Sequence, residues 1–106
     1  MAEIHERKHL KAGEEFPFVI EKMQITKGSY VEGELVEYDE TTNKLKKLAV
    51  AKNIFAVVTD NIKLEEDSET TVYLTGIFNK NAITKNGALD DEEVRVAGIA
   101  KNIYIR

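Results

Sequence analysis

Residues 53–59 read NIFAVVT, and the five residues between the terminal Asn and Thr are all apolar. Most of these side chains are β-branched or aromatic. A short apolar run of this kind is typical of a strand that is covered on both faces. We therefore predict that this stretch is the central strand of the fold.

Shorter apolar stretches on the N-terminal side predict three further strands. Residues 16–20 (FPFVI) predict an edge strand, because Pro17 has no N–H to offer to a sheet. Residues 30–38 (YVEGELVEY) predict a strand with a bulge at Gly33. Residues 45–50 predict a half-buried strand.

Turns and one more strand complete the β-rich part of the sequence. Residues 27–29 and 39–43 predict polar turns, and residues 60–69, with five acids and one lysine, predict a solvated loop or edge. Residues 71–78 (TVYLTGIF) predict a strand with a bulge at Gly76. Alternation along this strand places Val72, Leu74 and Phe78 on one face and Tyr73 and Ile77 on the other.

One stretch near the C-terminus has helical character. The acids at residues 90–93 suit the first turn of a helix, and the apolar residues that follow at helical spacing are Val96, Ile99, Ala100 and Ile103. Gly98 costs such a helix about 1 kcal/mol against alanine. We predict that Asn102 ends the helix in a left-handed conformation and that residues 103–105 return as a strand. Asn86-Gly87 predicts a turn before the helix.

Length and composition limit the possible classes of protein. The 106 residues suit one domain, and 15 basic against 19 acidic residues give a net charge of −4, which disfavours nucleic-acid binding. No cysteine is present and no apolar run is long enough to cross a membrane. We expect a mainly β domain at residues 16–106, small and clip-like or barrel-like, with one C-terminal helix. Residues 1–15, charged and poor in apolar side chains, predict a flexible N-terminal arm.

One metal-binding motif is present, and we interpret it as accidental. His5, Glu6 and His9 form an H-E-x-x-H pattern, which on a buried helix can bind zinc. Here the pattern starts four residues from Met1, has Arg7 and Lys8 at its centre, and lacks a third histidine or an apolar face that would hold it rigidly. We predict no metal site and no cofactor.

Other catalytic patterns are weak. The paired carboxylates at residues 14–15, 65–67 and 90–93 fall in polar loops or at a helix start, where solvation and capping explain them. No phosphate-binding glycine loop and no G-x-S-x-G motif is present. We therefore expect a binding or structural protein without catalytic residues.

The order of these features resembles the head-decoration proteins of lambda-like tailed bacteriophages. The resemblance covers residues 30–106. It is carried by Gly33-Glu34-Leu35-Val36, Tyr38-Asp39, the apolar strand at residues 54–60, the Val72–Asn79 element and the closing segment from Leu89 to Arg106. Asn102 stands where the family usually has glycine.

The resemblance implies a function as well as a fold. Such proteins assemble as trimers that bind the major capsid protein on the outside of the expanded head and stabilise it, so the chain would be made in the host cytoplasm and reside in the virion. The apolar segment Phe16, Pro17, Phe18, Val19 and Ile20 is then the candidate capsid contact, because it could pair with the edge of a neighbouring sheet. The alternative is a small β-barrel module that binds a peptide, a glycan or another ligand.

Overall fold

A computed structural model describes residues 18–106 of the chain. Its strands are β1 (Val19–Ile25), β2 (Gly28–Tyr30), β3 (Leu35–Asp39), β4 (Lys44–Lys47), β5 (Ile54–Val58), β6 (Ile62–Leu64), β7 (Ser68–Phe78) and β8 (Ile103–Ile105). Its helices are the 3₁₀ turns η1 (Ala51–Asn53) and η2 (Lys80–Ala82) and the α-helix α1 (Asp91–Ala100). The predicted fold class, mainly β with one helix near the C-terminus, is confirmed.

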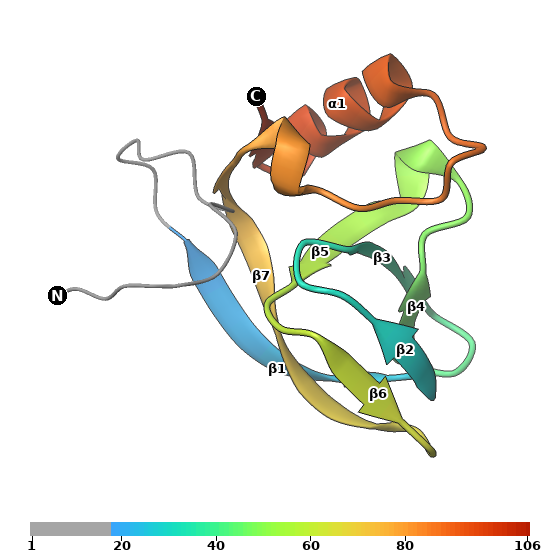
Figure 1. The fold of residues 1–106 in the computed structure, drawn as a ribbon. Coiled ribbons are helices and arrows are strands. Elements are labelled where there is room, and N and C mark those ends of the chain that lie inside the picture. Colours follow the sequence, from blue (N-terminus) through green and yellow to red (C-terminus); the bar gives the residue numbers. More distant parts are fainter. Residues whose placement is uncertain (1–17) are drawn as a thin grey trace, which may run out of the picture.

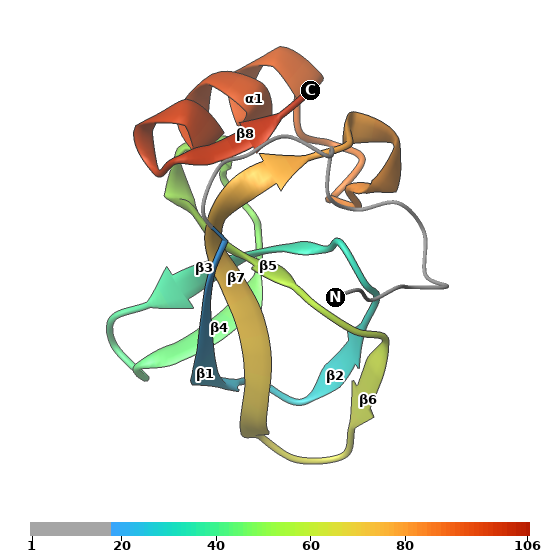
Figure 2. The ribbon, with the colours of Figure 1, turned by 90° about the vertical axis from the view of Figure 1, so that its left-hand side faces the viewer.

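Five strands close into a small barrel (Figure 1). The sheet order is β1-β4-β3-β5-β7, and β7 returns to pair with β1 in antiparallel fashion. Helix α1 and β8 lie on one side of the barrel, and the two-stranded sheet of β2 and β6 lies on the opposite side (Figure 2).

The central strand is buried on both faces, as its composition predicts. Ala56 and Val58 of β5 belong to an apolar cluster that draws residues from all five barrel strands and fills the barrel interior. Ile54 and Val57 belong to a second cluster, which α1, β8 and the two 3₁₀ turns cover. All four side chains are fully inaccessible to solvent, so β5 separates the two halves of the core.

The residues that end α1 behave as expected. Asp90 caps the N-terminus, where its carboxylate accepts a hydrogen bond from Glu93 N at 3.0 Å. Asn102 has a φ of 62°, the left-handed conformation that ends the helix. The chain then enters β8, which runs parallel to β7.

One strand prediction and one turn prediction need correction. Residues 30–38 do not form one strand, because a turn at Glu32 and Gly33 separates β2 from β3, and Gly33 takes a φ of 88° there. Residues 28–29, predicted as a turn, instead form β2, which pairs with β6. Short strands of this kind depend on a distant partner, and the local sequence does not show that partner.

The face pattern predicted for β7 is also wrong. Phe78 packs in the same cluster as Tyr73, whereas Val72 and Leu74 belong to the barrel interior. The register against β1 shifts because β7 has one more residue than β1 between Tyr73 and Thr75. An extra residue of this kind reverses the alternation of side chains beyond it.

The apolar face predicted for the helix is turned outward. Val96 and Ile99 are 51% and 43% exposed, whereas Val94 and Gly98 are buried. Gly98 lies against the backbone carbonyl of Ile103, which an added Cβ would contact. The glycine therefore faces β8, because any side chain at this position would hold the helix farther from the strand.

Candidate protein-interaction surface

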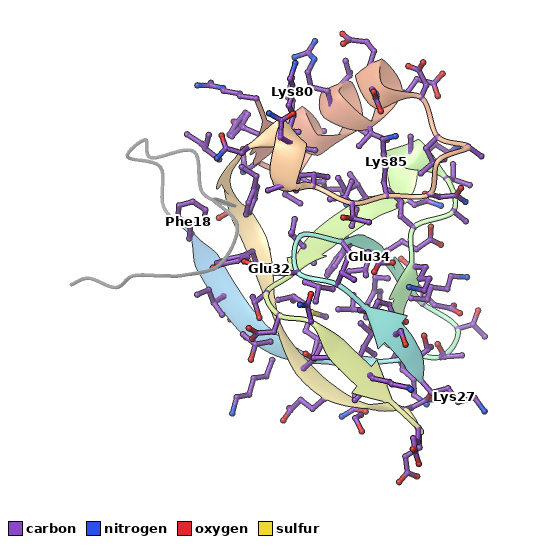
Figure 3. All side chains as sticks on the ribbon, viewed as in Figure 1. Phe18, Lys27, Glu32, Glu34, Lys80 and Lys85 are labelled. Carbon is purple, nitrogen blue, oxygen red and sulfur yellow. The ribbon has the colours of Figure 1, made fainter. Side chains whose placement is uncertain are left out.

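An aromatic cluster marks the point where the described domain begins. The rings of Phe18, Tyr73 and Phe78 lie 5.5 Å from one another, centroid to centroid, in edge-to-face arrangements. The Phe18 ring also covers Gly76 and leaves no room for a side chain there, and the φ of 150° at Gly76 independently favours glycine. Phe18, predicted as a capsid contact, therefore packs against its own domain and fixes the start of β1 (Figure 3).

The next two predicted contact residues are open to solvent. Val19 is 42% exposed and Ile20 is 50% exposed. Both belong to β1, which pairs with β7 along its whole length, and Val19 N donates a hydrogen bond to Thr75 Oγ1 at 3.2 Å. The structure thus holds two apolar side chains on an ordered strand where solvent reaches them.

The other edge of β1 is open over most of its length. Strand β4 meets β1 only where Ile25 faces Leu45, next to a bond of 3.0 Å from Thr26 N to Leu45 O. Within residues 18–106, no strand pairs with the outward edge of residues 19–24. Because alternate residues of an antiparallel strand direct their N–H and C=O groups away from the partner, this edge can accept another strand.

The remaining predicted site residues lie outside the described part of the chain. These are Phe16 and Pro17 of the contact segment and His5, Glu6 and His9 of the H-E-x-x-H pattern. Within residues 18–106, no group of three or more acidic or histidine side chains is arranged to hold a metal ion.

The sequence did not predict a second exposed apolar surface, beside α1. Val50 at 45% exposure, Val96 and Ala97 line a shallow hollow between η1 and the helix. Lys52 lies at its rim, as do Glu92 and Glu93. We name these residues the η1–α1 hollow. The apolar residues at helical spacing in the sequence could have indicated this surface, but their spacing does not show whether that face of the helix points inward or outward.

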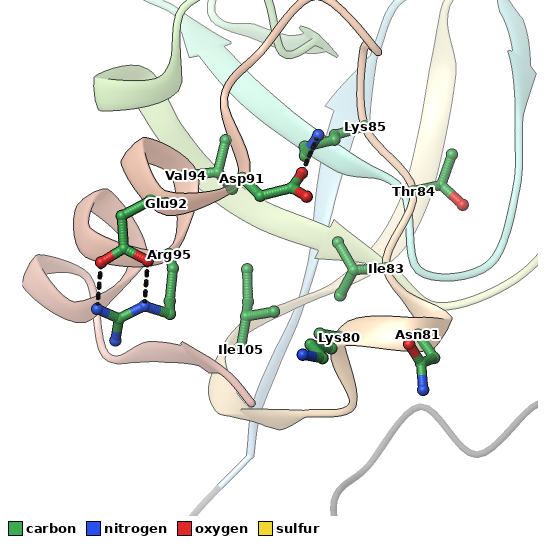
Figure 4. Close-up of a pocket in the computed structure, with 10 residues that line it drawn as sticks. All are labelled: Lys80, Asn81, Ile83, Thr84, Lys85, Asp91, Glu92, Val94, Arg95 and Ile105. Atoms are coloured by element: carbon green, nitrogen blue, oxygen red, sulfur yellow. Dashed lines mark hydrogen bonds and ion pairs between the residues drawn. The ribbon is translucent and has the colours of Figure 1, made fainter.

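A second hollow lies between α1 and the segment that follows η2, and the side chains of two ion pairs line it (Figure 4). Lys85 Nζ lies 2.6 Å from Asp91 Oδ1, and Arg95 binds Glu92 at 2.6 and 3.1 Å. The hydrogen bond from Lys85 lowers the pKa of Asp91, and that from Arg95 lowers the pKa of Glu92. The Lys85–Asp91 pair ties the helix to the preceding segment, whereas the Arg95–Glu92 pair lies within α1, and we assign both a structural role.

The tyrosines do not line either hollow. Tyr30 is buried and its hydroxyl lies 2.7 Å from Thr26 Oγ1, and Tyr38 donates to Asn43 Oδ1 at 2.9 Å. Tyr38 also stacks on Phe55 at 5.3 Å. Their contacts with the domain agree with strand residues that keep their hydroxyls bonded.

No known family model matches the chain, and no curated protein matches it at a significant level. No helix within residues 18–106 has the length and apolar character needed to cross a membrane.

Proposed function

We propose that this chain is a non-enzymatic decoration protein of a tailed-bacteriophage capsid, which binds the outer surface of the expanded head as a trimer and stabilises it. The order of sequence elements supports this proposal through its resemblance to lambda-like head-decoration proteins. The small β-barrel with a C-terminal helix is compatible with it.

The open edge of β1 is the observation that carries the proposal. It lies at the start of the described domain, separated by three residues from the segment predicted as an arm (residues 1–15), and presents Val19 and Ile20 to solvent. A capsid-protein strand that adds to this edge would gain main-chain hydrogen bonds, and the two side chains would add apolar contacts. Three such edges in one trimer would bind a shell far more tightly than one.

The η1–α1 hollow is the surface that we assign to contact between copies. Its apolar centre lies between a basic rim at Lys52 and an acidic rim at Glu92 and Glu93. A neighbouring copy can therefore bury Val50 and Val96 while rims of opposite charge meet. In Figure 1 α1 lies above the barrel and β1 lies along its lower left side, so one copy can use the η1–α1 hollow and the β1 edge at once.

The alternative function, a barrel module that binds a peptide or another ligand, uses the same β1 edge. An extended peptide would add to that edge in the same way as a capsid strand. The two functions differ in what is bound and in whether a viral head gains stability.

The experiment compares expanded heads of the phage that encodes the chain, stripped of this protein, before and after its addition. The native chain should bind and raise the resistance of the heads to heat and chelator. The double variant V19K/I20K should bind on the order of tenfold more weakly or worse, because two apolar contacts per copy are lost from a multivalent complex.

The matched control is Val31→Lys. Val31 is 41% exposed but lies in the β2–β3 connection, so this variant makes the same kind of change away from the edge. It should bind heads like the native chain. Heads that neither bind the native chain nor gain resistance would contradict the proposal, and binding of peptides in their place would support the alternative.

A further inference from the structure

The loop before α1 contains an asparagine followed by a glycine, Asn86 and Gly87, both exposed. Residues 86–88 are exposed and lie outside every described strand and helix. In this dipeptide the backbone nitrogen of the glycine can approach the side-chain amide carbon of the asparagine with little obstruction, because glycine has no Cβ.

The Asn86 side chain is folded over the backbone that follows it. Asn86 Oδ1 accepts a hydrogen bond from Ala88 N at 2.9 Å. The ring that this bond closes contains both Asn86 Cγ and Gly87 N, so the bond keeps the two reacting atoms close together. The same donor stabilises the negative charge that develops on Oδ1 when Cγ is attacked.

The N–H of Gly87, the attacking nitrogen, is not engaged in a hydrogen bond with residues 18–106. Within residues 18–106, no group accepts a hydrogen bond from Gly87 N, whereas the next backbone bond in the loop joins Leu89 N to Asn86 O at 3.0 Å. No hydrogen bond of the fold therefore has to break before Gly87 N reacts.

We propose that Asn86 is a site of spontaneous deamidation. Gly87 N gives up its proton to the solvent and forms a bond to Asn86 Cγ. The bond from Cγ to Nδ2 breaks, and Nδ2 takes up a proton from the solvent and leaves as ammonia. Water then opens the cyclic imide at one of its two carbonyls. The products are aspartate or, where the backbone passes through the side chain, isoaspartate. Water is the only co-reactant.

Either product changes the loop that leads into α1. A carboxylate appears next to Lys85, which already binds Asp91 and donates to Leu89 O at 3.1 Å. The isoaspartyl product also lengthens the backbone shortly before Asp90, the residue that caps the helix. The protein would therefore accumulate acidic forms with time.

The structure supplies two controls. Gly87 has no left-handed φ and an added Cβ would meet no atom within 4 Å, so Gly87→Ala keeps the turn and places a methyl group beside the attacking nitrogen. Asn43 also lies exposed in a turn, but Lys44 follows it, and its Oδ1 is bound by the Tyr38 hydroxyl.

The experiment incubates the native chain and G87A side by side in mildly alkaline buffer at physiological temperature, followed by trypsin and mass spectrometry. Cleavage after Lys85 and Arg95 releases residues 86–95, in which Asn86 is the only asparagine. In the native chain this peptide should gain the mass of an amide-to-acid exchange and separate into two forms. In G87A its conversion should fall to that of the Asn43 peptide. An unchanged native peptide, or equal conversion in G87A, would overturn the proposal.

Discussion

Replacement of Gly98 by alanine is expected to have opposite effects on stability in an isolated helix and in the folded chain. In an isolated helix, Gly98→Ala should stabilise by about 1 kcal/mol. In the folded chain the added Cβ would contact the carbonyl oxygen of Ile103, and that oxygen belongs to the backbone of β8. We therefore expect G98A to destabilise the domain by about 1–3 kcal/mol, because α1 and β8 must move apart. Denaturant unfolding measures the change.

Gly87→Ala is the control for this prediction. It makes the same substitution in open space, so its effect should stay within about 0.5 kcal/mol. The sign of the G98A effect decides between the two interpretations, and a stabilised G98A variant would show that helix propensity outweighs the contact with β8.

Among the elements, the pairing of β1 with β4, where Ile25 faces Leu45, closes the barrel. Asp67, in the β6–β7 loop, joins the segments on both sides of this point: Oδ1 accepts from Lys27 N at 2.8 Å and Oδ2 lies 2.7 Å from Lys44 Nζ. The hydrogen bond from Lys44, followed by that from Lys27, lowers the pKa of Asp67. The Asp67 carboxylate therefore connects the β6–β7 loop to the β1–β2 connection and to the first residue of β4, next to the single residue pair that joins β1 to β4.

The lowered pKa predicts how stability depends on pH. A carboxyl group with a lower pKa in the folded chain stabilises the fold above its ordinary pKa, and this contribution is lost as the pH falls through the folded value. Asp67→Asn should therefore lower the melting temperature at neutral pH. The difference from the native chain should shrink as the pH falls from about 5 toward 2.

Glu66→Gln is the matched control, since it removes a neighbouring carboxylate for which the described residues supply no hydrogen bond. Its melting curve should follow the native one at each pH. A difference between D67N and the native chain that stays constant from neutral to acid pH would contradict the assigned role of Asp67.

The elements that were predicted correctly are those whose signal is local. The apolar run of β5, the turn at residues 39–43 and the acid-capped helix each follow from neighbouring residues. The pairing of β2 with β6 depends on segments more than thirty residues apart, and the orientation of α1 depends on the carbonyl of Ile103. Of the candidate contact residues, Val19 and Ile20 are exposed, while Phe18 packs against Gly76, which lies far away in the sequence.

At the scale of the whole molecule, the β1 edge and the η1–α1 hollow are two exposed surfaces that differ in the groups they offer to a partner. The outward edge of β1 at residues 19–24 has no partner strand among residues 18–106, and such an edge suits a strand from another protein. The η1–α1 hollow offers apolar side chains between charged rims, which suit a folded surface. This difference is the reason that we assign the capsid contact to the first feature and the contact between copies to the second.

The proposed trimer predicts how the mass of the particle depends on concentration. The η1–α1 hollow exposes few apolar side chains compared with the roughly 20–30 residues per side of a stable interface, so we expect reversible association that a shell would strengthen. Light scattering should show the native mass rising toward three chains with concentration. Val96→Lys places a charge in the apolar centre and should hold the mass at one chain, whereas Val31→Lys should associate like the native protein. Equal association of V96K and the native chain would assign the contact to another surface, and a monomeric native chain at every concentration would leave trimer formation to the shell alone.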